Sequence, residues 1–219
     1  LFLVPSRLGD VAPETVLPAR TVAVARGLAH YVVENAKPAR HYLKALGPTR
    51  PLQEIAIVEL PANVTAARCA ELLAPARGGH DMGLLSDAGC PAVADPGARL
   101  VAAAHAEGIA VVPLVGPSSP LLALMASGMN GQGFTFHGYL PVKREARAEA
   151  LRRIEADSAR TGYAQLFIET PYRVVKNGKV SNEIAWLDAN KEEEAVIAQA
   201  NARLNDDGSF IDELILCRQ

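Results

Sequence analysis

The segment from Met82 to Gly97 carries the residue types that are best suited to chemistry. An apolar stretch, typical of a buried strand, ends there in a loop of oxygen-bearing, glycine and proline residues at Ser86, Asp87, Gly89, Pro91, Asp95, Pro96 and Gly97. Hydroxyl and carboxylate oxygens bind polar groups of a ligand, glycine lets the backbone approach it closely, and proline stiffens the path. The pattern predicts a ligand-binding loop at the carboxyl end of a strand. The structural alternative is that Asp95 caps the helix after Gly97.

A second loop of the same kind runs from Val115 to Pro120, after a strand-like stretch. Its candidate binding residues are Gly116, Pro117, Ser118 and Ser119. A helix is expected to begin here, and the free N–H groups of a helix amino-terminus suit a carboxylate or a ribose hydroxyl. The structural alternative makes Ser118 or Ser119 the N-cap of that helix. Neither loop has the glycine spacing of a Walker A or dinucleotide-binding motif, so phosphate binding is not favoured.

Alternating strands and helices must position these loops. Patterns typical of short strands occur at 1–4, 29–34, 55–59, 81–85 and 110–114. Helical patterns occur at 15–26, 39–46, 65–76, 98–107 and 119–127. Such alternation predicts an α/β fold in which crossover helices cover both faces of a largely parallel sheet. Ligands of such sheets bind beyond the carboxyl ends of the strands, where both loops fall.

A flexible, polar break between Gly128 and Gly133 is the predicted domain boundary. Residues 1–130 then form an amino-terminal α/β domain, and residues 131–173 begin a smaller second α/β domain. The second domain is expected to contain strands at 134–138 and 164–169 on either side of a charged helix.

That charged helix is expected from Val142 to about Ser158. Its basic side chains, with one just beyond it, are Lys143, Arg144, Arg147, Arg152, Arg153 and Arg160. Acidic residues are interspersed, and Glu149 and Arg153 are spaced for an ion pair. A solvated surface is the default interpretation, and a surface that contacts RNA is the alternative.

The composition changes near Tyr172, and residues 174–219 form an atypical tail. All 15 prolines of the chain lie at or before Pro171. The tail has nine acidic and five basic residues, a net charge of −4, whereas the whole chain has −2. Asn177-Gly178 between apolar residues predicts a two-residue hairpin, and a later strand is expected at 210–216.

The 219 residues have the composition of a soluble globular protein, with 49% hydrophobic and 21% charged residues. Neither a membrane span nor a leader is evident, so a cytoplasmic protein is expected, with no membrane partner. Because Leu1 already resembles a core-strand residue, the natural start is expected to be missing. The three cysteines and five histidines lack the spacing of a disulfide framework or a metal site, and Cys90 is expected to be an apolar filler.

Three motifs resemble those of the tetrapyrrole-methylase superfamily. They read Ser86-Asp-Ala-Gly-Cys-Pro-Ala-Val-Ala-Asp-Pro-Gly97, Val112-Pro-Leu-Val-Gly-Pro-Ser-Ser119 and Phe136-His-Gly-Tyr-Leu-Pro141. The similarity runs from about Leu1 to Arg173 and is nearest the branch that includes the ribosomal RNA small-subunit methyltransferase I. It implies two α/β domains with S-adenosylmethionine between them, usually in a homodimer. The implied reaction is methyl transfer to ribosomal RNA of the small subunit, at a ribose 2′-oxygen.

The resemblance also implies which residues bind the cofactor. The first loop matches at Ser86, Asp87, Gly89, Pro91 and Asp95, and the second at Gly116, Pro117, Ser118 and Ser119. The run from Glu169 to Arg173, with Glu169 and Pro171, resembles the second domain's contribution near the adenine. No catalytic residue is assigned, and Asp87, Glu34 and Glu169 are candidate bases only through their positions.

Two segments depart from the ribosomal RNA enzymes. Pro5-Ser-Arg-Leu-Gly-Asp10 stands where they have Thr-Pro-Ile-Gly-Asn-Leu, and Glu34-Asn-Ala-Lys37 stands where they have Glu-Asp-Thr-Arg. The departures leave open a different methyl acceptor in the same fold, such as a tetrapyrrole-like small molecule.

The tail, from about 169 to 219, resembles a segment of the bacterial RNA polymerase β subunit. Residues 167–173 fit both families, so a junction is expected there. We interpret the chain as a chimera whose second methylase domain is incomplete, with exposed strand edges. An inactive chimera is therefore a further alternative to an active methyltransferase.

Overall fold

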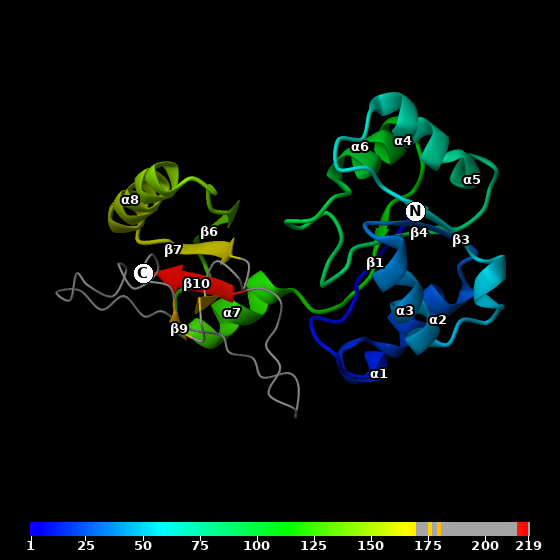
Figure 1. The fold of residues 1–219 in the computed structure, drawn as a ribbon, viewed down its shortest axis with the longest axis horizontal. Coiled ribbons are helices and arrows are strands. Elements are labelled where there is room, and N and C mark those ends of the chain that lie inside the picture. The colour runs from blue at the N-terminus through cyan, green and yellow to red at the C-terminus, as the bar shows by residue number, and fades with distance from the viewer. Residues whose placement is uncertain (170–174, 177–178, 181–213, 219) are drawn as a thin grey trace. The chain divides into compact units, whose positions relative to one another are not determined.

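The computed structural model describes residues 1–169, 175–176, 179–180 and 214–218. The chain divides into two compact units, Leu1–Pro117 and Ser118–Gln219 (Figure 1). Within the described ranges, no helix has the length and apolar character needed to cross a membrane.

A five-stranded sheet lies at the centre of the first unit. Its strands are β1 (Phe2–Val4), β2 (His30–Val33), β3 (Ala56–Glu59), β4 (Met82–Leu85) and β5 (Val112–Pro113). They lie in the order β3-β2-β4-β1-β5, and every neighbouring pair is parallel. The predicted α/β class and the five predicted strands are thus confirmed. β5 is shorter than predicted and ends at Pro113, which has no N–H to donate to a ladder.

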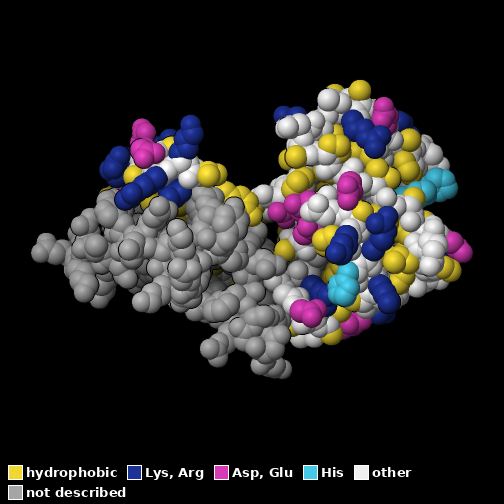
Figure 2. Space-filling view, in the orientation of Figure 1, with side chains coloured by type: hydrophobic (Ala, Val, Ile, Leu, Met, Phe, Trp, Pro, Cys, Tyr) yellow, Lys and Arg dark blue, Asp and Glu magenta, His cyan; other side chains and the backbone are white. Residues whose placement is uncertain are grey.

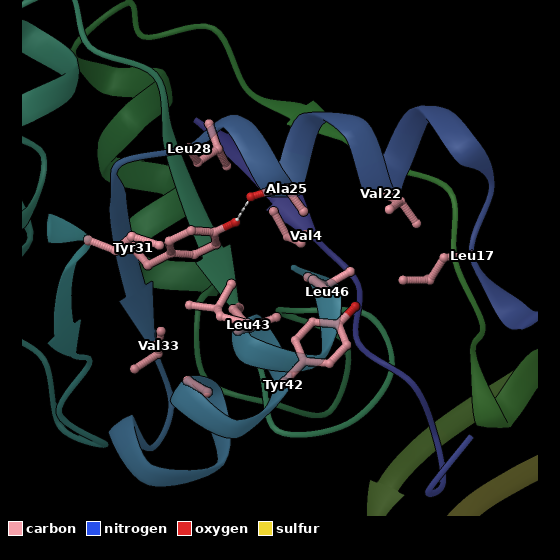
Figure 3. Close-up of a cluster of buried hydrophobic side chains, with 13 residues drawn as sticks. Val4, Leu17, Val22, Ala25, Leu28, Tyr31, Val33, Tyr42, Leu43 and Leu46 are labelled. Carbon is pink, nitrogen blue, oxygen red and sulfur yellow. Dashed lines mark hydrogen bonds between the residues drawn. The ribbon is translucent and has the colours of Figure 1, made fainter. Parts of the chain in front are cut away.

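Three helices cover one face of this sheet (Figure 3). They are α1 (Pro13–Val16), α2 (Ala19–Gly27) and α3 (Ala36–Leu46). Tyr31 and Val33 point to this face because alternate strand residues share a side, and they pack with Leu43 and Leu46 of α3. The single helix predicted over 15–26 is wrong in one respect, since Pro18 is the N-cap of α2 and separates it from α1.

The other face is covered by α4 (Ala66–Leu72), α5 (Ala74–Arg77) and α6 (Ala98–Ala106). Val32 and Leu84 point to this face and pack with Leu72 and Leu100. The helix predicted over 65–76 is also interrupted, because Pro75 cannot donate a backbone hydrogen bond to the preceding turn. A short 3₁₀ helix, η1 (Leu52–Glu54), precedes β3.

The helices on the two faces of the sheet follow different strands. β1 and β2 lead into α1 to α3, whereas β3 and β4 lead into α4 to α6. β4 lies between β1 and β2, so the connection that follows β4 leaves in the opposite direction from those of both neighbours. Ligands of open α/β sheets bind at such a point, outside the carboxyl ends of the strands. We call this set of strand ends and following loops the switch-point edge.

The second unit contains a smaller sheet. The strands of this sheet are β6 (Phe134–Tyr139), β7 (Ala164–Glu169) and β10 (Leu214–Arg218), and the helices of the unit are α7 (Ser119–Ser127) and α8 (Arg144–Thr161). β7 is the central strand, parallel to β6 and antiparallel to β10. Apolar residues of α7 and β7 form its core, including Leu124, Leu166 and Ile168.

The tail elements agree with the predictions where they are described. β8 (Val175–Lys176) and β9 (Lys179–Val180) pair antiparallel across two residues, as the predicted hairpin requires. β10 begins at Leu214, within the strand predicted at 210–216, and the first four residues of that range lie outside the described residues.

The compact units divide between Pro117 and Ser118, because α7 packs on β7. The boundary predicted near residue 130 falls after that helix, at the turn that follows Gly128. Gly128 itself has a φ of 72° and ends α7 in the left-handed conformation that glycine favours.

Candidate functional site

Loops from three strands are joined at the switch-point edge. The Ser6 N–H, just after β1, donates to the Gly89 carbonyl at 2.8 Å. The Asn35 amide, just after β2, donates from Nδ2 to Oδ2 of Asp87 at 2.7 Å. The Asp87 N–H in turn donates to Oε2 of Glu34 at 3.2 Å. The loop over 86–97 is therefore tied to both neighbouring strand ends, as its place at the switch point predicts.

Asn35 makes this contact instead of capping its own helix. It occupies the N-cap position of α3, yet its side chain makes no cap hydrogen bond. Oε1 of Glu59, at the end of β3, accepts from the Ala36 N–H at 2.7 Å. A carboxylate suits the positive end of the helix, so Glu59 does the capping and leaves the Asn35 amide for Asp87.

Close backbone approach at two glycines shapes the edge. A Cβ atom at Gly116 would overlap the ring of Pro5. At Gly97, a Cβ atom would lie 2.8 Å from Leu84 Cδ2, and the φ of 141° is one that other residues rarely adopt. Both glycines therefore make close contacts within the chain, and the predicted close approach to a ligand stays a prediction.

The same loop contains two alanines with positive φ, 66° at Ala92 and 64° at Ala94. Non-glycine residues pay about 1–2 kcal/mol in this conformation, and such strain gathers at ligand-binding loops. Sequence patterns did not predict this feature because alanine carries no signal for a left-handed backbone.

Cys90 links the first loop to the second. Its Sγ–H donates to the Pro117 carbonyl at 3.3 Å. Burial raises the pKa of this thiol, and the nearby Asp95 carboxylate raises it further. The thiol is therefore protonated at neutral pH and holds two loops together, which goes beyond the apolar filler predicted from the sequence.

The remaining first-loop candidates differ in exposure. The Ser86 side chain is buried and donates to the Ala88 carbonyl at 3.3 Å, so it stiffens the loop. Asp87 is exposed, Pro91 is buried and Asp95 is half-buried. The N-cap position of α6 belongs to Gly97, two residues after Asp95.

The second loop is divided between the two compact units. Gly116 and Pro117 belong to the first, and Ser118 and Ser119 belong to the second. Ser118 is the N-cap of α7, but its side chain makes no cap bond. The predicted N-cap position is therefore confirmed, while the expected side-chain cap is absent at Ser118.

The two second-domain candidates are only partly described. Glu169 ends β7 and pairs with Leu214 of β10, and its side chain lies outside the described part. Pro171 lies outside the described residues altogether.

A further segment of the edge, from Pro5 to Val11, is held by its own contacts. Arg7 pairs with Asp10 at 3.0 Å and donates to the Val11 carbonyl at 2.7 Å. The Tyr42 hydroxyl of α3 donates to the Pro5 carbonyl at 2.9 Å. Burial raises the pKa of Tyr42, so this donor keeps its proton.

Sequence reasoning did not assign Ser6, Asn35 or Glu59 to the site. A signal for all three exists, since each lies at or just beyond the carboxyl end of a predicted strand, as Asp87 does. What the sequence does not contain is the strand order, which brings these ends together. Among the described residues, no group of three His, Cys, Asp or Glu side chains is arranged to hold a metal ion.

The exposed surface of α8 carries cations without acidic partners. Among the described residues, Arg152 and Arg153 make no ion pair, and the spacing of Glu149 with Arg153 does not produce one. Exposed pairs of long side chains gain little free energy, which explains the missing contact. Figure 2 shows blue Lys and Arg side chains over α8 beside a smaller acidic group.

Proteins with the name ribosomal RNA small subunit methyltransferase I are similar to this chain. The protein of Mesorhizobium japonicum is 38% identical over 180 residues, which is 81% of this chain and 56% of the relative. The Xylella fastidiosa protein is 34% identical over 169 residues, 77% of this chain and 56% of the relative. That of Escherichia coli O157:H7 is 31% identical over 175 residues, 80% of this chain and 57% of the relative. The chain thus spans a little more than half the length of these relatives.

Solved structures share the fold at low sequence identity. The methyltransferase CobJ superposes with a TM-score of 0.56 at 17% identity, covering 97% of this chain and 90% of that one. Diphthine synthase gives a TM-score of 0.59 at 15% identity, covering 100% of this chain and 90% of that one.

The tail matches a different family. The profile described as the RNA polymerase beta subunit external 1 domain covers residues 172–219. This confirms the similarity to the polymerase β subunit that the sequence of the tail predicts. About four-fifths of the chain is therefore similar to ribosomal RNA small subunit methyltransferase I proteins, the chain shares the fold of the methyltransferase CobJ and of diphthine synthase, and its tail is similar to a polymerase β-subunit domain.

Proposed function

We propose that this chain is an S-adenosylmethionine-dependent methyltransferase whose cofactor binds at the switch-point edge. The observation that carries the proposal is the network there, in which the first loop is hydrogen-bonded to the ends of β1 and β2. Similarity to named methyltransferases over about four-fifths of the chain supports it. The proposed cofactor residues are Ser86, Asp87, Gly89, Pro91, Asp95, Gly116, Pro117, Ser118, Ser119, Glu169 and Pro171.

The chemistry of the edge fits this cofactor. Its sulfonium and ammonium groups are cationic, and the edge offers the carboxylates of Glu34, Asp87 and Asp95. Close packing of the backbone at Gly97 against Leu84, and at Gly116 against Pro5, fixes the paths of the two loops. The loops lack the glycine pattern of a phosphate cradle, in keeping with a cofactor that has no phosphate.

The protein's task in such a reaction is alignment. When bound, the cofactor supplies an activated methyl group, so the chain needs no nucleophile of its own. An acceptor hydroxyl that took up this methyl group would have to give its proton to a base or to water. Asp87 is the proposed base, because Asn35 and Glu34 fix its side chain and its backbone respectively. Glu34 and Glu169 are the other candidates.

We propose ribosomal RNA of the small subunit as the acceptor, at a ribose 2′-oxygen. The printed names of the relatives support this substrate class. The unpaired cations of α8 offer a place for RNA phosphates, and a cytoplasmic homodimer completes the proposal.

A methyl-transfer assay tests this function. Small ribosomal subunits from cells that lack the corresponding methyltransferase are incubated with the chain and cofactor labelled in its methyl group. We expect the wild-type chain to transfer label to the RNA. An Asp87→Asn variant should transfer the label at least tenfold more slowly. Label on a small molecule from cell extract, with none on the subunits, would instead favour the small-molecule alternative.

The match of residues 172–219 to a polymerase domain favours a second candidate. In this interpretation the methylase part ends near residue 173, and residues 174–219 are a joined fragment that leaves the chain inactive. The same proposal divides the chain into three parts, which are residues 1–130, 131–173 and 174–219. Sequencing the native gene tests it, because a continuous gene that encodes the tail would remove the chimera from consideration.

A further inference from the structure

The hydroxyl group of Ser6 is buried without a hydrogen bond. Ser6 is 1% exposed, and its Oγ has no partner among the described residues. A hydroxyl in this state has given up water without replacement, which costs free energy. An alanine at the same position would avoid that cost, so the hydroxyl does not serve the stability of the ligand-free chain.

Ser6 lies between the two loops that the proposed function assigns to the cofactor. Its N–H donates to Gly89 of the first loop at 2.8 Å. The adjacent Pro5 packs against Gly116 of the second loop, and a Cβ atom at Gly89 would lie 3.1 Å from Cδ2 of Leu8. The residue that carries the unpartnered hydroxyl thus contacts the first loop through its backbone, and its neighbour Pro5 contacts the second.

We infer that the Ser6 hydroxyl forms a hydrogen bond to an oxygen of the adenosyl cofactor at the switch-point edge. This inference rests on the proposed function. In the complex, the Ser6 hydroxyl exchanges an unsatisfied environment for a satisfied one. A serine hydroxyl can donate to a carboxylate or to a ribose oxygen, so one group suits either end of the ligand.

One substitution at Ser6 should change stability and cofactor affinity in opposite directions. Ser6→Ala removes the cost of the unsatisfied hydroxyl, so the melting temperature of the ligand-free chain should equal or exceed that of the wild type. The same change removes a hydrogen bond from the complex, so the dissociation constant for S-adenosylhomocysteine should rise about tenfold.

The test measures both quantities in the full chain by calorimetry. Ser158→Ala is the matched control, because this buried hydroxyl already donates to the Tyr163 carbonyl at 3.3 Å. The control should lose stability and bind S-adenosylhomocysteine as the wild type does. Ser6→Cys keeps a weaker hydrogen-bonding group at nearly the same volume and should give an intermediate affinity, which covers the case of a poorly folded Ser6→Ala variant.

The outcomes separate this inference from the function on which it rests. No binding by the folded wild type overturns both. Wild-type binding together with unchanged affinity in Ser6→Ala and Ser6→Cys overturns only the role of Ser6. A lower melting temperature with unchanged affinity in Ser6→Ala assigns the hydroxyl a structural role and also overturns the inference.

Discussion

Asp87 and Asn35 are far apart in the sequence and share one hydrogen bond of 2.7 Å. The contact orients a carboxylate, and the Glu34 carboxylate accepts from the Asp87 N–H within the same network. Two carboxylates held near each other form a site for a cationic ligand, because each gains from the opposite charge. At the scale of single residues, Asp87 is therefore the most informative position.

Replacing Asp87 by Asn keeps the shape of the side chain and removes its charge. We expect the dissociation constant for S-adenosylhomocysteine to rise by about one to two orders of magnitude, since a hydrogen bond to a charged group contributes about 1.5–3 kcal/mol. Titration calorimetry measures this change. Asp81→Asn is the control, because this exposed aspartate precedes the same strand, β4, at its other end. Equal weakening by both substitutions would contradict a specific role for Asp87.

Single residues were predictable from the sequence where their type alone carries the information. Gly97 is one example, because a glycine that follows a predicted strand and precedes a predicted helix marks a special backbone conformation. The places of Ser6 and Glu59 at or beyond the ends of predicted strands were visible, but the burial of Ser6 and the contact of Glu59 with Ala36 were not predictable. Such contacts depend on strand order, which periodicity does not contain.

At the scale of elements, the helices and strands follow hydrophobic periodicity closely, and the differences occur at prolines. Pro18 and Pro75 each interrupt a stretch that the pattern assigned to one helix. The apolar pattern continues across both prolines because the two short helices bury the same side, so periodicity alone merges them. α8 is the element whose function the pattern left open, between a solvated surface and a nucleic-acid contact.

Substitutions at Arg152 and Arg153 of α8 distinguish a solvated surface from a nucleic-acid contact. If α8 contacts RNA phosphates, the double substitution Arg152→Gln and Arg153→Gln should weaken binding to small ribosomal subunits. The plot of log affinity against log salt should also flatten by about 0.7–0.9 for each lost phosphate contact. Binding at several salt concentrations gives this slope, and S-adenosylhomocysteine affinity should not change.

A matched control removes two cations from the first unit. Arg68→Gln and Arg77→Gln change the net charge equally, but these side chains pair with Glu71 at 2.7 Å and with Glu107 at 2.9 Å. An equal loss of RNA affinity in both double variants would mean that only total charge matters. The solvated-surface interpretation of α8 would then hold.

At the scale of the whole molecule, the core of the first unit is expected to make the protein less stable at alkaline pH. Tyr31 and Tyr42 are buried, and burial is the main cause that raises the pKa of each hydroxyl above 10.0. The Tyr31 hydroxyl donates to the Ala25 carbonyl at 2.6 Å (Figure 3). In the unfolded chain both hydroxyls ionise near their ordinary pKa, whereas the folded chain keeps both protons.

The free energy of unfolding should therefore be constant with respect to these groups below about pH 10 and should fall above it. The unfolded state binds fewer protons there, so each tyrosine contributes a slope of up to about 1.4 kcal/mol per pH unit. Urea unfolding followed by far-ultraviolet circular dichroism between pH 8 and pH 11 measures the slope. Buried Cys69 and half-buried Cys90, whose pKa values are also raised, act in the same direction from about pH 9. The double variant Tyr31→Phe and Tyr42→Phe should lose most of the slope above pH 10, and an unchanged slope would contradict this explanation.

The whole chain joins two kinds of sequence, and the similarity of both parts to known families was readable from motifs and composition. The parallel sheet of the first unit and the small sheet of the second were predictable as a class, because alternating strands and helices permit few arrangements. The antiparallel pairing of β10 with β7 was not predictable, since a strand from the tail joins a sheet whose other strands lie before residue 170.

Titration of the full chain with S-adenosylhomocysteine tests directly whether the switch-point edge binds the cofactor. We expect saturable binding with one site per chain, because the loops of the switch-point edge lie within the first 119 residues. Circular dichroism of the same sample establishes that the chain is folded. A folded chain that gives no binding heat at several temperatures, and no rise in melting temperature with ligand, would contradict the claim.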